Sequence, residues 1–214
     1  MPIIKNLSGL NIKVVMDGNS LTASNSQYIS TKITAYLTPL VGSVEMISLG
    51  VSGQRLQTMF NNASGVNGVY SRVNPAKYNI LILNEDANGI LQDSYGEFRQ
   101  LQLMNQYISG AYRAKFDAII TWNRWYPRLP HDLFQPTAQN LLAFKNYCNL
   151  ANTSERLYSN ANVDMREAPN IGGVENQNQN ATYFIDYLHL NNTGNDIVAQ
   201  RLIDYGINQI FTFN

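Results

Sequence analysis

Residues 15–22 read Val-Met-Asp-Gly-Asn-Ser-Leu-Thr and place a serine directly after a short apolar segment. That segment begins at Ile12 and has the β-branched composition of a buried strand. Gly18 lets the backbone turn sharply after the strand, so that Ser20 stands at the start of the next element. A serine in such a turn is usually a helix cap, but it is also where an exposed nucleophile can be held.

Apolar runs of this kind alternate along the chain with longer segments of helical periodicity. Expected strands are 12–16, 44–49, 80–83 and 118–122, with a weaker one near Val163. Four helices are expected. The first ends before Pro39, and the last runs from about Gly194 to Gln209. Between them, one helix opens at Pro136 and Thr137, and an earlier one carries along one face Phe98, Leu101, Met104, Ile108 and Tyr112. The alternation predicts an α/β fold around a parallel sheet. In such sheets, ligands bind beyond the carboxyl ends of the strands.

Near the other end of the chain, residues 186–189 read Asp-Tyr-Leu-His. Residues three apart in one turn lie on the same side, so the Asp186 carboxylate can accept the Nδ1 proton of His189 and leave Nε2 to act as a base. A duller interpretation makes His189 part of the cap of the last helix, beside Asn192 and Thr193. Metal binding is the weaker alternative, because an Asp-x-x-His pair lacks a third ligand at an obvious spacing. The sequence predicts no metal and no cofactor.

Two further loops could donate hydrogen bonds to a developing oxyanion. The loop 50–54 follows the second expected strand, and the Gly53 amide would lie exposed at a helix start. The loop 84–89 follows the third strand and offers side-chain amides at Asn84 and Asn88. Each loop by itself is an ordinary strand-to-helix turn, and their joint order with Ser20 and the Asp-x-x-His pair is what favours a site.

Composition sets the outer limits. A chain of 214 residues suits a single domain spanning 1–214, and its fifteen basic and fifteen acidic residues give a formal net charge of zero. Because no Lys/Arg cluster forms a stripe, nucleic acid is not expected as a partner. The single cysteine, Cys148, is expected to be a buried apolar residue. The N-terminus lacks an export signal, and no apolar run is long enough to span a membrane, so the chain is expected to be soluble, cytoplasmic or virion-associated. The sequence leaves the oligomeric state open.

Taken together, these motifs resemble those of the SGNH (GDSL-like) hydrolases. Gly18-Asn19-Ser20-Leu21 resembles the first block of the family, Val51-Ser52-Gly53-Gln54 the second, Asn84-Glu85-Asp86-Ala87-Asn88 the third, and Asp186 to His189 the fifth. The resemblance implies a flavodoxin-like three-layer α/β/α sandwich with about five parallel strands. It implies Ser20 as nucleophile, His189 as base and Asp186 as its orienter. It also implies an oxyanion hole made by the Ser20 amide, the Gly53 amide and the Asn88 side chain.

The chain departs from the family pattern at two positions. Asn19 stands where the family usually has aspartate, and Gly89 stands where aspartate commonly follows the third-block asparagine. Neither change removes a group that moves protons in the implied mechanism. The choice between Asn88 and Asn84 stays open from the residues, and the resemblance favours Asn88.

The resemblance implies a serine esterase that removes short acyl groups, and the chain's own composition favours a carbohydrate as the alcohol. An Asn/Gln-rich loop at 172–180 precedes the Asp-x-x-His turn, and Trp122, Arg124 and Trp125 follow the fourth strand, where they could bind sugar rings. Trp122 and Trp125 could instead close the edge of the core. A phage or bacterial polysaccharide-modifying protein would fit this composition. The alternatives are a lipid or thioester hydrolase of the same fold, and a glycan-binding module that keeps the fold without catalysis.

Overall fold

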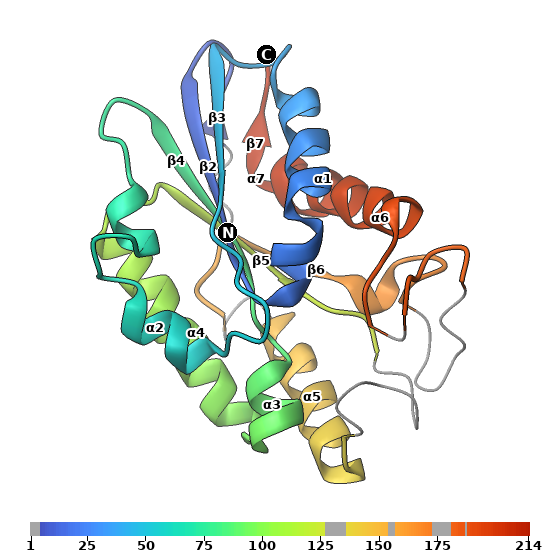
Figure 1. The fold of residues 1–214 in the computed structure, drawn as a ribbon. Helices are drawn as coiled ribbons and strands as arrows, with labels where there is room; N and C mark the ends of the chain where they lie inside the picture. The colour runs from blue at the N-terminus through green and yellow to red at the C-terminus, as the bar shows by residue number, and fades with distance from the viewer. Residues whose placement is uncertain (1–4, 127–135, 154–156, 173–180, 187) are drawn as a thin grey trace.

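Five apolar segments pair side by side and form a wholly parallel sheet at the centre of the molecule (Figure 1). The computed structural model describes residues 5–126, 136–153, 157–172, 181–186 and 188–214. The sheet has the order β3-β2-β4-β5-β6, with bounds β2 Asn11–Gly18, β3 Ser43–Ser48, β4 Tyr78–Asn84, β5 Ala118–Asn123 and β6 Ala161–Asp164. This is the flavodoxin-like order, in which the second strand of the sheet in chain order, β3, lies at the edge and the first, β2, lies beside it.

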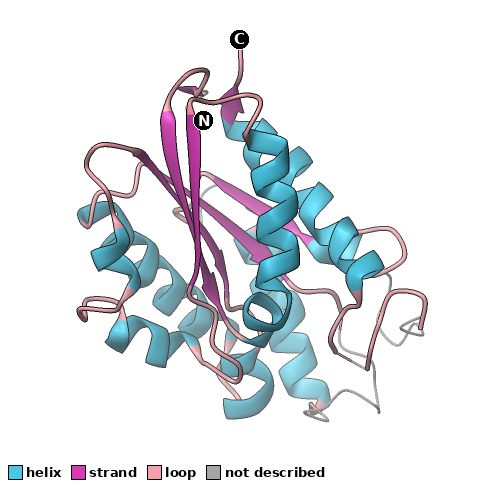
Figure 2. Ribbon diagram, turned by 45° about the horizontal axis from the view of Figure 1, so that its top comes forward, coloured by secondary structure: helices cyan, strands magenta, loops and turns pink. Residues whose placement is uncertain are grey.

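Helices cover both faces of the sheet, which makes three layers (Figure 2). The first face is covered by α1 (Ser20–Leu37) and α6 (Asn192–Leu202), and α6 continues through the π-helical turn η3 (Ile203–Ile207) into α7 (Asn208–Ile210). The second face carries α2 (Leu56–Asn62), η1 (Val69–Arg72), α3 (Asn88–Asp93), α4 (Glu97–Arg113) and α5 (Ala138–Ala151). A short η2 (Met165–Glu167) follows β6, and a separate two-stranded parallel pair joins β1 (Lys5–Asn6) to β7 (Phe211–Thr212).

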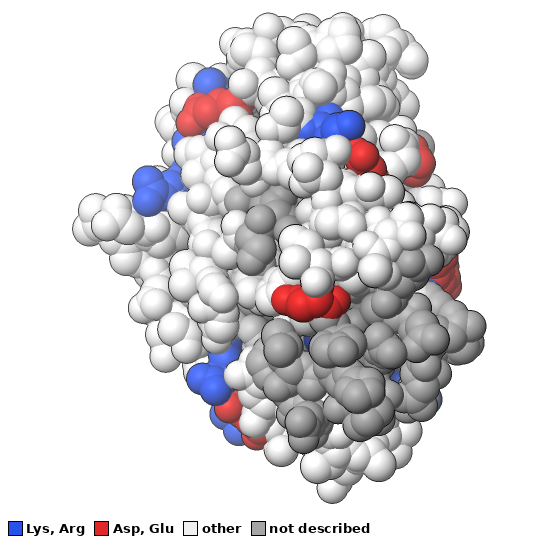
Figure 3. Space-filling model, turned by 45° about the vertical axis from the view of Figure 1, so that its right-hand side comes forward, with Lys and Arg blue, Asp and Glu red and all other residues white. Residues whose placement is uncertain are grey.

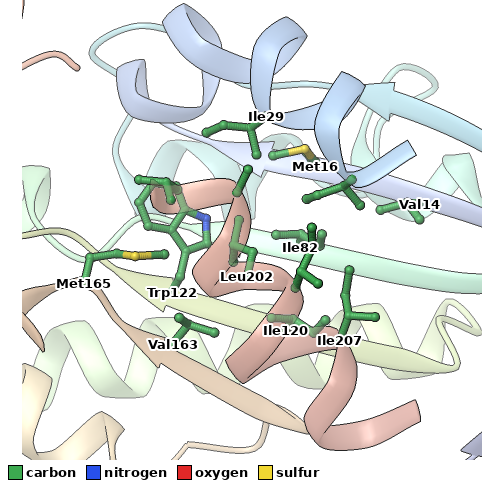
Figure 4. Close-up of a cluster of buried hydrophobic side chains, with 14 of the residues drawn as sticks. Val14, Met16, Ile29, Ile82, Ile120, Trp122, Val163, Met165, Leu202 and Ile207 are labelled. Carbon is green, nitrogen blue, oxygen red and sulfur yellow. The ribbon is translucent and has the colours of Figure 1, made fainter. Parts of the chain in front are cut away.

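The alternation of side chains along each strand divides the interior into two cores. In β2, Val14 and Met16 belong to the core under α1 and α6, whereas Val15 belongs to the core under α4 and α5. Figure 4 shows the first of these cores, with strand and helix side chains in mutual contact. Strands that are apolar on both faces need cover on both, which is why helices flank this sheet on two sides.

The observed elements confirm the predicted α/β fold and the predicted order of strands. All five expected strands are present, and Thr137 caps α5 by accepting a hydrogen bond from the Asn140 amide at 3.1 Å. One detail was wrong. Phe98 is 65% exposed and faces solvent instead of the core. The last helix widens at Ile203–Ile207, where an added Cβ at Gly206 would meet Ile120 Cγ2 at 3.0 Å, so the helix lies close on the sheet.

Among the described residues, no helix combines the length and the apolar character that crossing a membrane would require. Charged side chains on the face seen in Figure 3 occur in small separate groups of either sign. Cys148 is fully buried, as predicted. Residues 173–180 of the Asn/Gln-rich loop lie outside the described part of the chain.

Candidate active site

Three adjacent strands end at one edge of the sheet, and each is followed by one of the candidate residues. Ser20 follows β2, Gly53 follows β3 and Asn88 follows β4. Backbone hydrogen bonds join the three loops: the Val51 amide donates to Gly18 O at 3.0 Å, and the Asn19 amide donates to Asn84 O at 3.3 Å. The strand order reverses at β2, so this edge is the switch point where ligands bind in open α/β sheets.

Ser20 is the first residue of α1, and Asn19 is its cap. The Asn19 side chain accepts a hydrogen bond from the Leu21 amide at 2.9 Å, and Asn19 O accepts from the amides of Thr22 and Ala23. Those bonds satisfy the other amides of the first turn, and among the described residues nothing accepts from the Ser20 amide. The turn needs glycine at position 18, because an added Cβ would lie 2.3 Å from Asn84 O. Ser20 therefore presents its hydroxyl and an available N–H at one helix start.

Asp186 and His189 form the hydrogen-bonded pair that their spacing predicts. His189 Nδ1 lies 2.8 Å from Asp186 Oδ2, and Asp186 Oδ1 accepts from the amides of Leu188 and His189, both at 2.6 Å. Burial by itself would raise the pKa of Asp186, but the hydrogen bonds from the His189 side chain and from the two amides lower it overall. Asp186 is therefore an ionised acceptor that orients the imidazole.

The turn that carries this pair is fixed at its base. The Ile185 amide donates to His189 O and the Asn191 amide donates to Tyr183 O, both at 2.9 Å, while Asn191 caps α6 through the Gly194 amide. His189 Nε2 is shielded from solvent and has no hydrogen-bond partner among the described residues. The imidazole thus keeps one nitrogen for Asp186 and one nitrogen free.

The packing of α1 against α6 brings the start of α1 toward the turn that carries His189. Tyr28 donates to Asp196 of α6 at 3.0 Å and Tyr36 donates to Asn208 of α7 at 2.7 Å, so α1 and the last helical segment run in the same direction. Leu21, beside Ser20, and Leu188, beside His189, both belong to the buried cluster that fills this face of the sheet. The nucleophile and base candidates therefore lie at the same edge of the sheet, although Ser20 Oγ and His189 Nε2 are not hydrogen-bonded to each other.

The candidate oxyanion donors lie on two loops that contact each other. Gly53 has a φ of +72°, a backbone conformation that favours glycine, in a turn closed by the Gln54 amide on Val51 O at 3.2 Å. Gly53 precedes α2 by three residues, so its amide belongs to this turn and not, as predicted, to the helix start. Asn88 Nδ2 donates to Gln54 O at 2.9 Å, which holds the Asn88 side chain against the Gly53 turn.

Asn84 is placed differently from Asn88. It is fully buried, and its Nδ2 donates to Trp122 O at 2.9 Å, so this side chain joins β4 to β5 inside the sheet. Asn84 Nδ2 also lies 3.5 Å from Asp86 Oδ1, so both of its N–H groups have acceptors, whereas Asn88 Nδ2 has one acceptor among the described residues, Gln54 O, and keeps a second N–H for an oxyanion. The geometry favours Asn88 for that role.

Asn88→Ala should lower kcat for ester hydrolysis by about 10²- to 10³-fold with little change in stability, the usual cost of losing one oxyanion donor. Asn84→Ala should instead lower the free energy of unfolding by about 1–3 kcal/mol, because it leaves Trp122 O without its donor. Steady-state kinetics and urea unfolding of both variants separate the two effects. A folded Asn84→Ala protein with the larger loss of kcat would reverse the assignment.

The residues expected to bind sugar rings are core residues in this structure. Trp122, Arg124 and Trp125 are at most 2% exposed, and Figure 4 shows the Trp122 indole among Met165, Val163 and Leu202. The Arg124 amide donates to Asp86 Oδ2 at 2.7 Å. A ring that is surrounded by core side chains has no face left for a sugar, so the edge-of-core interpretation describes the two tryptophans better.

Three buried acids behind the loops escaped the sequence interpretation, although each lies at or just after the end of an apolar strand. Burial raises the pKa of Asp17 to about 6, although hydrogen bonds from the Tyr107 hydroxyl and the Gly18 amide oppose it. Burial likewise raises the pKa of Asp86 to about 6 and that of Glu85 to about 7. Acidic residues where a core would tolerate only apolar ones were the available signal.

No protein-family model matches the chain, and no curated protein sequence matches it either. Solved structures do. TesA superposes with a TM-score of 0.66 at 13% identity, covering 92% of this chain and 99% of TesA. The lipase/acylhydrolase from Enterococcus faecalis gives 0.61 at 13% identity (90% and 93% covered), and the acetyl xylan esterase AlAXEase gives 0.59 at 16% identity (90% and 98% covered). With its sheet order and with the motif residues at one edge, the chain has the fold of the SGNH-type esterases and lipases.

Proposed function

We propose that this chain is a serine carboxylic ester hydrolase that removes short, acetyl-type acyl groups from a carbohydrate. The observation that carries the proposal is the His189 imidazole, held through Nδ1 by Asp186 with Nε2 unpartnered, at the sheet edge where Ser20 begins α1. An oriented base with a free nitrogen near a serine hydroxyl is the arrangement that nucleophilic acyl transfer requires.

In the proposed cycle, Ser20 Oγ attacks the ester carbonyl carbon while His189 Nε2 takes the hydroxyl proton. The negative oxygen is held by the amides of Ser20 and Gly53 and by Asn88 Nδ2. The carbon–oxygen bond to the alcohol then breaks, and the alcohol leaves with the proton from His189. Water, deprotonated by His189, attacks the acyl-serine and releases the acid, which restores Ser20. This cycle uses only groups of the chain and water.

The surroundings of the candidate site favour a short acyl group. Val51 and Ile185, next to Gly53 and Asp186, are exposed apolar side chains, 54% and 73% exposed respectively. These two are the large apolar side chains that the described residues of the two turns leave largely exposed, which supports contact with a small acyl group. The likeness in fold to the acetyl xylan esterase AlAXEase supports an acetylated glycan.

A panel of p-nitrophenyl esters from acetate to dodecanoate tests the acyl preference. We expect kcat/KM to be highest for acetate and to fall along the series, because the described rim offers little apolar surface to additional methylenes. Release of acetate from acetylated oligosaccharides, measured in parallel, should exceed release from p-nitrophenyl acetate in kcat/KM. A preference for octanoate or longer would contradict this proposal and indicate the alternative, a lipid or thioester hydrolase. The likeness in fold between this chain and the Enterococcus faecalis lipase/acylhydrolase is the reason to keep that alternative.

A further inference from the structure

Glu85 has no part in the proposed cycle, yet it contacts two of the loops that the cycle needs. It is fully buried just after β4. Its Oε2 accepts from Asn19 Nδ2 at 3.3 Å and from the amides of Ala87 and Asn88 at 3.1 and 3.2 Å. One carboxylate oxygen therefore joins the turn after β2, which carries Ser20, to the turn after β4, which carries Asn88.

The Asn19 side chain uses both ends of its amide in this arrangement. Its Oδ1 accepts from the Leu21 amide at 2.9 Å, as a helix cap does, and its Nδ2 donates to Glu85. An aspartate could cap α1 equally well but has no N–H to donate. It would place a second carboxylate about 3.3 Å from Glu85 Oε2, away from water. Asparagine at position 19 therefore serves both the helix cap and Glu85, whereas an aspartate could serve only the cap.

The backbone of Glu85 is held from the opposite side. Gln100 Nε2, from α4, donates to Glu85 O at 2.7 Å. Asn88, whose amide Glu85 binds, in turn donates from its side chain to Gln54 O beside Gly53. All three candidate oxyanion donors therefore lie on segments that this network connects.

We propose that Asn19 and Glu85 form a positioning pair that sets the separation between Ser20 and the oxyanion donor Asn88. The proposal rests on the function proposed above, because only an acyl-transfer site needs that separation. Catalytic groups must be held to a fraction of an ångström for efficient reaction, and loss of such support lowers turnover more than substrate binding.

The electrostatics of Glu85 supply an independent readout. Burial and then the charge of Asp86 raise the pKa of Glu85 to about 7, although the hydrogen bonds from Asn88, Ala87 and Asn19 oppose this rise. From α5, the hydroxyl of Tyr147 also interacts with the charge of Glu85. The folded state therefore holds this proton more tightly than the unfolded chain. The contribution of Glu85 to the free energy of unfolding accordingly falls as the pH rises from its ordinary value of 4.5 toward about 7. In Glu85→Gln that part of the pH dependence should be missing.

The test uses Asn19→Asp, Glu85→Gln and the double variant. Asn19→Asp should lower kcat for p-nitrophenyl acetate about tenfold or more at nearly constant KM, because two buried carboxylates repel and the loops move apart. Adding Glu85→Gln leaves one carboxylate and should recover most of that loss. Lower pH should also relieve the defect of Asn19→Asp, since one carboxyl is then protonated. Glu167→Gln, which alters a carboxylate 76% exposed in η2, is the matched control.

Because Asn19→Asp could fail to fold, Asn19→Ser provides a second variant. Serine can cap α1 but is too short to reach Glu85, so kcat should again fall about tenfold while the melting curve stays near that of the wild type. A folded Asn19→Ser or Asn19→Asp protein with wild-type kcat, or a double variant no better than Asn19→Asp, would overturn the positioning pair. A wild-type protein without any esterase activity would instead refute the proposed function itself.

Discussion

Ser20→Ala is expected to abolish ester hydrolysis, with kcat falling by about four to six orders of magnitude. The hydroxyl is the only group of the protein that bonds to the acyl carbon in the proposed cycle, and alanine cannot replace it. The melting temperature should stay within a few degrees, because a serine hydroxyl at a helix start contributes little packing and the cap belongs to Asn19. Kinetics on p-nitrophenyl acetate and circular dichroism melting check the two parts.

A fluorophosphonate probe sharpens this test. The wild type should be labelled on Ser20, and Ser20→Ala should not be labelled. Ser30→Ala removes another hydroxyl of α1, one that bonds to Gln27 O at 3.1 Å on the surface, and should behave as the wild type. A folded wild type that resists the probe would identify the chain as a non-catalytic module, the other alternative to an esterase.

His189→Ala should lower kcat by about four to six orders of magnitude as well, because the proposed cycle relies on this imidazole to take the Ser20 proton. Asp186→Ala should cost about ten- to a hundredfold less than His189→Ala, since the base remains but loses its orientation. The double variant Ser20→Ala/His189→Ala should be no worse than either single variant, because the two residues act as a unit.

Gln200→Ala is the control for these two variants. Gln200 lies on the exposed side of α6, where its side chain bonds to Asp204 at 2.9 Å, so its loss should leave kcat unchanged. If His189→Ala kept a tenth or more of wild-type kcat in a folded sample, the imidazole would be no more than part of a helix cap.

The sheet was predictable from the sequence because buried parallel strands are continuous apolar runs, and all five expected runs became strands. The Asp186–His189 contact was predictable for a similar reason, since partners three residues apart meet in any tight turn. Phe98 was misplaced because its spacing matches the inner face of α4, whereas the position lies at the first turn, where the helix extends past the core.

The tryptophan-rich segment shows where sequence reasoning stops. Trp122 and Trp125 suit both a sugar-binding rim and a core edge, since aromatic rings serve both. Only packing decides, and here both rings are enclosed. The same holds for Asn84 and Asn88. Both are amides on one loop, but the carbonyl that each one meets, Trp122 O or Gln54 O, belongs to a distant segment.

The sequence by itself determined the local features of this protein: the strands, the helix starts and the Asp-x-x-His turn, because each depends on neighbours within a few residues. The tertiary structure alone decided which side chains share a space. It set Glu85 against Asn19, 66 residues away, and thereby let the asparagine before Ser20 serve both the helix cap and Glu85. The local pattern shows that acids stand at the ends of apolar strands, but it does not show the donors that make their burial tolerable, because these come from other strands and helices.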